Sequence, residues 1–243
     1  VKRRFEEAVA DTGQQDQIEV SLSVGPGSRP ENATRISDPG QMKGGTQIDR
    51  NGSGTVCTSN QMILTNNVWG VLTAGHCLSN LGVQQWSHNG LTFGTEHSSW
   101  YTNFSNADAG IIALNNGGLG SEYFHILTSD FTGAWVDDQE VMTSMNTSSE
   151  NTNTTVCHEG RTPKVGTNLP VTTCGNFVSL QVITCSCGVT LINQAVANFT
   201  VCAGDSGATV RQGTVGYGII SRRTGGTEYT GPDGNPCSPQ GSY

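Results

Sequence analysis

The sequence predicts an all-β protein made of antiparallel strands in a sandwich or a pair of barrels, and three observations support this prediction. Charged residues make up only 13% of the 243-residue chain, half the usual ~25%, which argues against coiled coils and helical bundles. The 32 glycines indicate many tight turns. After residue 45, short β-type runs follow one another closely, and no amphipathic helix longer than two turns interrupts them.

The first 43 residues differ from the rest. Residues 1–11 place apolar side chains at helical spacing, and a strand-like alternation of apolar and polar residues follows at 18–24. Residues 25–45 contain three prolines and several glycines, which is typical of a linker. We therefore expect residues 1–43 to be a propeptide remnant and linker; an N-terminal arm packed on the body is the alternative.

From residue 45 onward the chain consists of short apolar or alternating runs bounded by Gly, Asn and Ser. A low-complexity stretch at 146–155 is nearly all Asn, Ser and Thr, so we expect it to be an exposed loop. We predict strands at 61–64, 69–73, 109–114, 135–136, 177–184, 189–192, 209–210 and 215–220.

The charge balance argues against two classes of partner. The 12 basic and 20 acidic residues give a net charge of −8 and an isoelectric point of about 5.0. Phosphate backbones and anionic membrane surfaces are therefore repelled. No run approaches the ~18–20 apolar residues that a membrane span needs. We expect neither a nucleic-acid nor a membrane partner.

The eight cysteines indicate the compartment. An even count in a chain with few charges is typical of disulfide-bonded proteins in an oxidising, extracytoplasmic setting. Zinc sites need clustered Cys/His pairs, which this sequence lacks. Spacing alone leaves ~105 disulfide pairings open.

Composition alone predicts roughly four glycosylation sequons, so those present are compatible with a glycoprotein but add little evidence for one. They begin at Asn32, Asn51, Asn103, Asn146, Asn153 and Asn198.

Three residues in distinctive segments can together perform nucleophilic catalysis: His76 after Thr-Ala-Gly, Asp108 before an apolar run, and Ser206 in Gly-Asp-Ser-Gly. A serine hydroxyl is a weak nucleophile unless a base removes its proton. A histidine can take that proton, and a buried carboxylate fixes the histidine tautomer and stabilises the imidazolium. Each residue alone has a structural explanation, but their occurrence in the order His–Asp–Ser predicts a catalytic triad.

The surrounding motifs resemble those of the chymotrypsin-like serine proteases. Residues 73–77 match the histidine motif in full. Residues 204–207 match four of the five positions of the serine motif, with Ala208 where a second glycine is usual. The resemblance covers about residues 44–240. It is closest to the secreted bacterial, streptogrisin-like branch, through residues 44–48, 57–58, 156–162, 174–175 and 234–237.

This resemblance implies two antiparallel six-stranded β-barrels with the catalytic cleft between them. Residues 44–128 would form the N-terminal barrel and residues 129–243 the C-terminal barrel. Relatives continue through another strand after the last cysteine, so we expect the C-terminal barrel to lack its end. The resemblance does not place Cys185 and Cys187. The bridges it implies are Cys57–Cys77, Cys157–Cys174 and Cys202–Cys237.

The resemblance also implies an activity: an extracellular serine endopeptidase, secreted as a zymogen, that hydrolyses protein or peptide substrates through an acyl-enzyme. Ser206 would be the nucleophile, His76 the general base and then acid, and Asp108 the carboxylate that orients His76. The backbone N–H groups of Gly204 and Ser206 would form the oxyanion hole. No cofactor or metal is implied, and we expect a monomer. The alternative is a protease-fold binding module that has lost activity.

Specificity depends on residues that the motifs define less well. Thr200 matches the base of the primary pocket and supplies no carboxylate, so we expect cleavage after uncharged residues rather than after Arg or Lys. Ser221 matches the start of the substrate-binding strand. Arg222 and Arg223 follow where small residues are usual, and they either point into solvent, narrow the pocket or attract an acidic side chain.

Asp205 has no obvious partner in this sequence. In the animal branch a new N-terminal ammonium pairs with this aspartate, but the Ile-Val-Gly-Gly start that this requires is absent. Bacterial relatives use an arginine directly after the cysteine that Cys157 matches. Here that residue is His158, and Arg161 follows three places on. Either side chain is a candidate for the structural partner of Asp205.

Overall fold

The structure is a computed structural model, and part of the chain lies outside the residues it describes. The predicted propeptide segment 1–43, Arg161 and most of the predicted loop at 146–155 belong to that part. The described residues are 44–66, 68–79, 81–115, 125–129, 135–141, 143–146, 154–160, 172–230 and 235–243.

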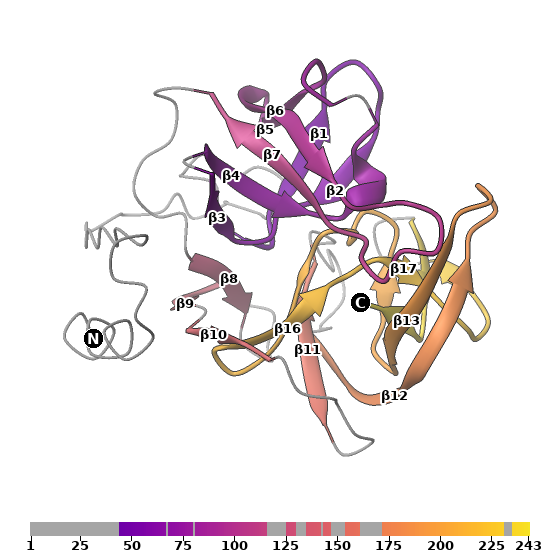
Figure 1. The fold of residues 1–243 in the computed structure, drawn as a ribbon. Coiled ribbons are helices and arrows are strands. Elements are labelled where there is room, and N and C mark those ends of the chain that lie inside the picture. The colour runs from indigo at the N-terminus through magenta and orange to yellow at the C-terminus, as the bar shows by residue number, and fades with distance from the viewer. Residues whose placement is uncertain are drawn as a thin grey trace.

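The first half of the described chain forms a seven-stranded antiparallel sheet in the order β2-β1-β5-β6-β7-β4-β3. Figure 1 shows this sheet curling in the upper part of the molecule, coloured indigo to pink. Its strands are β1 (Gln47–Arg50), β2 (Val56–Thr58), β3 (Met62–Thr65), β4 (Val68–Thr73), β5 (Gln85–His88), β6 (Leu91–Ser99) and β7 (Gly110–Leu114).

The second half forms an eight-stranded sheet in the order β10-β16-β15-β11-β12-β13-β20-β17, which is antiparallel except for the β10–β16 pair. Most of it is orange to yellow in Figure 1. Its strands are β10 (Ser144–Met145), β11 (Thr155–Glu159), β12 (Thr172–Thr184), β13 (Thr190–Ala197), β15 (Thr209–Gln212), β16 (Val215–Ile219), β17 (Arg222–Arg223) and β20 (Gly241–Ser242). Two small sheets are added, formed by β14 (Val201–Cys202), β19 (Pro236–Ser238) and β18 (Tyr229–Thr230), and by β8 (His125–Ser129) and β9 (Trp135–Val141).

The predicted fold class is confirmed. Each of the eight predicted strands overlaps an observed one, and the described residues contain one 3₁₀ turn, η2 (Gly75–Cys77), and no α-helix. The expected count of six strands in each half is not reproduced, because two- and three-residue edge strands such as β2, β10 and β17 extend the sheets. Within the described residues, no helix is long and apolar enough to cross a membrane.

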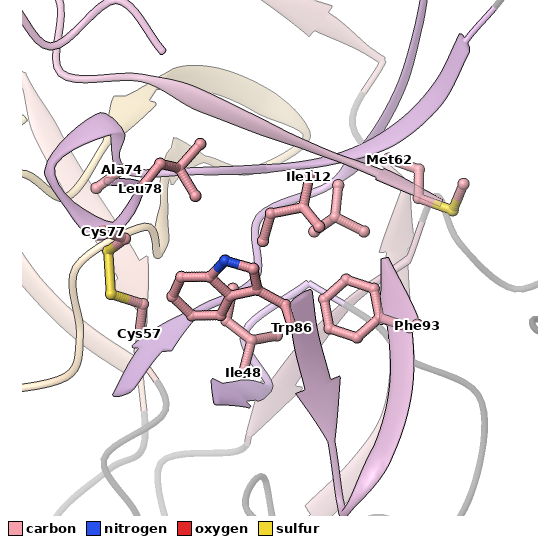
Figure 2. Packing of buried hydrophobic residues seen from close by; sticks show 10 residues of the cluster. Ile48, Cys57, Met62, Ala74, Cys77, Leu78, Trp86, Phe93 and Ile112 are labelled. Atoms are coloured by element: carbon pink, nitrogen blue, oxygen red, sulfur yellow. A yellow bond between two sulfur atoms is a disulfide. The ribbon is translucent and has the colours of Figure 1, made fainter. Parts of the chain in front are cut away.

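The core of the first half surrounds Trp86, whose side chain is fully buried. In Figure 2 the Trp86 ring lies among Ile48, Phe93 and Ile112, with the Cys57–Cys77 disulfide at one side of the cluster. Trp86 Nε1 donates a hydrogen bond to the buried Glu96 Oε1 at 3.1 Å, so its polar atom is satisfied. The Cys57–Cys77 disulfide, which lies next to His76 in the chain, is therefore packed into this core.

The core of the second half includes Ala208, which stands where a glycine is usual in the serine motif. Ala208 is fully buried and belongs to a cluster with Val156, Phe199, Val210 and Ile220. A methyl group here fills space in a close-packed interior, so it contributes to the core without reaching the cleft.

Four disulfides are present: Cys57–Cys77, Cys157–Cys174, Cys185–Cys187 and Cys202–Cys237. Three of them join the cysteines that the resemblance pairs, and the fourth joins the two it did not place.

Candidate active site

His76 lies in η2, directly after strand β4, and its backbone position is set by close packing. A Cβ atom on Gly75 would lie 2.6 Å from the Ala109 carbonyl oxygen and 2.7 Å from Tyr101 Cβ, so only glycine allows these segments to approach. The Cys57–Cys77 bridge ties the other end of the turn to β2. The histidine backbone is therefore held from both sides.

Asp108, just before β7, accepts hydrogen bonds on both carboxylate oxygens. Oδ1 accepts the backbone N–H of His76 at 2.8 Å, and Oδ2 lies 2.7 Å from His76 Nδ1. Oδ2 also accepts the Ser221 hydroxyl at 2.6 Å. Burial alone would raise the pKa of Asp108, but the hydrogen bond and charge interaction with His76, followed by the Ser221 hydrogen bond, outweigh it and hold the pKa below its ordinary value. The carboxylate is therefore ionised at neutral pH.

Ser206 lies in the loop between β14 and β15, and this loop is bonded to the other half of the molecule. Thr58 donates from its backbone N–H to the Ser206 carbonyl at 2.7 Å and from Oγ1 to the Gly204 carbonyl at 2.8 Å. Gly207 has φ of 97°, and a Cβ atom there would lie 2.1 Å from the Thr58 carbonyl oxygen. A glycine is thus required by both backbone conformation and space.

The three predicted triad side chains meet at His76. Its Nε2 lies 2.9 Å from Ser206 Oγ, and its Nδ1 faces Asp108. An ionised carboxylate only accepts hydrogen bonds, so Nδ1 carries a proton and, in the neutral ring, Nε2 is the acceptor for the serine hydroxyl. The His76 side chain is 27% exposed, so solvent and substrate can reach it, whereas the Asp108 side chain is 1% exposed.

The two backbone N–H groups predicted for an oxyanion hole flank Asp205. Among the described residues, neither the Gly204 nor the Ser206 N–H donates a hydrogen bond, although both carbonyls accept one from Thr58. Gly204 has φ of 94°, a conformation that glycine adopts without strain. Both N–H groups are therefore available to a ligand atom.

Solved structures similar to this chain bear on the fold, whereas a scan against protein-family models and a search of curated proteins find no match. The chain is similar to Thermobifida fusca protease A (TM-score 0.59, 17% identity), over 83% of this chain and 91% of that chain. It is similar to Nocardiopsis protease (TM-score 0.59, 20% identity, 83% and 92%) and to Cellulomonas bogoriensis chymotrypsin (TM-score 0.56, 20% identity, 83% and 91%). The chain has the chymotrypsin-like serine protease fold.

In this protease fold, Asp205 and His158 each make a hydrogen bond that the sequence did not suggest. Asp205 is buried, and its Oδ2 accepts the Cys202 N–H at 2.8 Å. His158 Nε2 donates to the Thr200 carbonyl at 2.6 Å, and the His158 ring packs against Phe199 with centroids 4.8 Å apart. The described hydrogen bond of His158 is thus directed to the predicted base of the primary pocket.

A pocket opens beside the triad, lined by residues that include His76, Gly204, Ser206, Ser221, Arg222 and Arg223. Ser221 is 1% exposed, because its hydroxyl is directed to Asp108 instead of solvent. Thr200, the predicted base of the primary pocket, is not one of the residues that line this pocket, although the adjoining Val201 is. The Tyr229 hydroxyl donates a hydrogen bond to Thr200 Oγ1 at 3.3 Å.

The sequence did not suggest Tyr101, which connects both parts of the site. Its ring stands edge-on to His76, with centroids 5.9 Å apart, and lies under the guanidinium of Arg222. Tyr101 belongs to the loop between β6 and β7, which crosses to the second half through an N–H···O bond from Phe104 to Thr190 at 2.6 Å. No local motif marks this tyrosine, because its role depends on contacts made across the whole chain.

Proposed function

We propose that this chain is a secreted serine endopeptidase that cleaves peptide bonds through an acyl-enzyme on Ser206. The main support is the position of His76, whose two ring nitrogens lie 2.7 Å from Asp108 Oδ2 and 2.9 Å from Ser206 Oγ. These distances are within hydrogen-bond reach for a base and the proton that it removes. The shared fold adds support, since the similar structures are named as proteases.

In the first step, Ser206 Oγ attacks the carbonyl carbon of the scissile peptide bond while its proton passes to His76 Nε2. The imidazolium that forms keeps its Nδ1–H on Asp108, and the ionised carboxylate stabilises the new positive charge. His76 then gives the proton to the leaving amine, and the C–N bond breaks. The acyl group remains on Ser206 as an ester.

In the second step, a water molecule replaces the amine. His76 accepts a proton from the water as its oxygen attacks the ester, and then returns a proton to Ser206 Oγ as the carboxylic acid leaves. The N–H groups of Gly204 and Ser206 would bind the negatively charged oxygen in both steps. One such donor contributes roughly 3–4 kcal/mol to lowering the barrier.

The disulfides support an extracellular compartment. Four bridges in a chain of this size favour an oxidising environment, where protein and peptide substrates are also found. The expected propeptide at 1–43 agrees with this proposal, because it would keep the peptidase inactive until secretion. Cleavage of that segment remains a prediction that N-terminal sequencing of the active protein would check.

Reaction with a fluorophosphonate tests the mechanism directly. We expect mass spectrometry to locate one adduct, on Ser206, and Ser206→Ala to prevent it. The same variant should lower kcat on a peptide substrate by roughly 10⁶-fold, because the three groups act as a unit, while the melting temperature stays close to that of the wild type. A folded wild-type protein that neither reacts nor hydrolyses peptides would instead favour a binding module. An adduct on another serine would overturn the assignment.

A further inference from the structure

We propose that Arg222 is a specificity-determining residue that binds a carboxylate of the substrate, so that peptides with Asp or Glu close to the scissile bond are preferred. This inference rests on the proposed peptidase function and adds a substrate class to it. Arg222 begins β17, directly after Ser221, and lines the same pocket as His76 and Ser206.

The first argument is that Arg222 has no carboxylate partner. Among the described residues there are four basic side chains apart from histidine. Three are paired with a glutamate: Arg50 with Glu96 at 3.6 Å, Arg211 with Glu159 at 2.8 Å, and Arg223 with Glu228 at 2.9 Å. Arg222 makes no ion pair in this part of the chain. A partly buried charge without a counter-charge carries a desolvation cost that an anionic ligand would offset.

The second argument is that Arg222 is held in place without being neutralised. Its guanidinium lies over the Tyr101 ring, 5.4 Å from the centroid, and its Nη2 donates a hydrogen bond to the Tyr101 hydroxyl. Disulfide sulfurs carry no proton, so the same hydroxyl donates toward Cys187 Sγ at 3.1 Å. Arg222 Nε is buried and has no hydrogen-bond partner among the described residues. The side chain is therefore oriented by Tyr101, and the Nη1 end of its guanidinium keeps N–H groups that bond to no described residue and are left for a ligand.

The third argument is electrostatic. The whole chain has a net charge of −8, yet the acidic and basic residues lining this pocket are Arg222, Arg223 and Glu228, which sum to +1. Glu228 is 60% exposed at the pocket margin, so solvent screens its charge more than that of Arg222. A pocket of opposite sign to the rest of the molecule concentrates anionic substrates at its mouth.

These contacts bear on the three orientations that the sequence left open for Arg222. Arg222 does not extend into solvent, because it is half-buried and stacked on Tyr101. Nor does Arg222 bond to Thr200, the predicted base of the pocket, whose Oγ1 accepts a hydrogen bond from the Tyr229 hydroxyl at 3.3 Å. Attraction of an acidic side chain is the orientation that agrees with the observed geometry.

The test uses a peptide library that places Asp, Asn, Glu or Gln at each of four positions on either side of the cleaved bond. We expect kcat/KM to be about tenfold higher for the acid than for its amide at one or more positions. Arg222→Gln should bring this ratio close to one, and Arg222→Lys should retain part of it, because lysine keeps the charge but not the planar donors. The wild-type ratio should also fall as salt is raised.

Arg223→Gln is the matched control, since it removes the same charge from the same pocket. If Arg222 binds the carboxylate directly, Arg223→Gln lowers the acid-to-amide ratio much less than Arg222→Gln does. Equal effects of the two variants, or no acid preference at any position in an enzyme that hydrolyses the neutral peptides, would overturn the proposal. Absence of hydrolysis of every peptide would instead contradict the peptidase function itself.

Discussion

The two sides of the candidate active site are built differently. The rear side holds Asp108, Ser221 and the Ser206 loop behind His76, and the front side is the pocket wall formed by Arg222 on Tyr101. Behind His76, Asp108 receives hydrogen bonds from the His76 backbone, the His76 ring and Ser221, and Thr58 holds the Ser206 loop from the opposite half. In front of it, the pocket wall depends on Arg222, which is held by one ring contact and one hydrogen bond to Tyr101. On the rear side, several donors bond to the Asp108 carboxylate. On the front side, the Arg222 guanidinium has N–H groups without a described partner.

This difference matches the two tasks of the site, which are catalysis on the rear side and choice of substrate on the front side. A base, its carboxylate and a nucleophile must keep their geometry within fractions of an ångström, so redundant hydrogen bonds are useful behind His76. A specificity wall must leave polar groups unpaired until a substrate supplies the partner, because unpaired buried groups discriminate most strongly between ligands. Variants behind His76 should therefore change kcat or stability, while variants in front should change the choice of substrate.

Asp108→Asn should have the largest effect on the rear side of the site. The amide nitrogen can donate a hydrogen bond, which favours the histidine tautomer with the proton on Nε2 and removes the acceptor for Ser206. We expect kcat to fall by about 10⁴-fold on a peptide substrate, with kcat/KM falling in parallel.

Asp49→Asn is the control for this change, because Asp49 lies in β1, away from the pocket, where its Oδ1 accepts a hydrogen bond from Gln47 Nε2 at 2.6 Å. It should leave kcat within about twofold of the wild type. A similar kcat loss in both variants, or near-wild-type turnover by Asp108→Asn, would show that the carboxylate does not act through His76.

Gly207→Ala should have the next largest effect, on stability. A Cβ atom at Gly207 would lie 2.1 Å from the Thr58 carbonyl oxygen and 2.3 Å from Thr73 Oγ1, so the contact between the two halves must shift. The backbone strain of a positive φ adds to this clash. We expect a loss of roughly 2–5 kcal/mol in the free energy of unfolding, measured with urea.

Gly213→Ala separates the clash from the backbone strain. Gly213 also has a positive φ, of 55°, but a Cβ atom there would meet nothing within 4 Å. Its variant should lose only about 1–2 kcal/mol, the cost of the left-handed conformation. Equal losses at both glycines would mean that the packing of the Ser206 loop on Thr58 contributes little.

The sequence predicted the rear side of the site far better than the front. His76, Asp108 and Ser206 lie in segments whose residue types are dictated locally by turn conformation and by the chemistry of proton transfer. Tyr101 was not predicted, and Arg222 was left with three alternatives. Their positions depend on the β6–β7 loop reaching the second half, which no short pattern encodes.

Ser221 and His158 show a second limit of sequence reasoning. Ser221 was assigned to the substrate-binding strand, and in the structure its hydroxyl also bonds to Asp108 from a position 113 residues away along the chain. His158 was a candidate partner for Asp205, and its described hydrogen bond goes to Thr200. In both cases the partner of the side chain is decided by tertiary packing and not by the neighbouring residues in the sequence.

Ser221→Ala should give the smallest effect, and it tests whether the rear side is redundant. The hydroxyl donates to an ionised carboxylate, so its loss should cost about 1–2 kcal/mol in the free energy of unfolding at pH 7. The Ser221 hydrogen bond is one of the interactions that lower the pKa of Asp108, so this pKa should rise in the variant. Because two donors from His76 remain, kcat should fall by less than about tenfold.

The pH dependence of that stability loss is the decisive part of the prediction. A carboxyl group whose pKa is lower in the folded state contributes stability that is fully present above its unfolded pKa of ~3.9 and is lost as the pH falls through its folded pKa. The difference in the free energy of unfolding between wild type and Ser221→Ala should therefore be constant near neutrality and shrink below about pH 4.

Ser242→Ala is the matched control, since Ser242 is equally buried and its hydroxyl has no hydrogen-bond partner among the described residues. Its effect on urea unfolding should be small and independent of pH. A Ser221→Ala loss that stayed the same from pH 7 to pH 3 would show that the hydroxyl stabilises the surrounding fold and not the charge on Asp108.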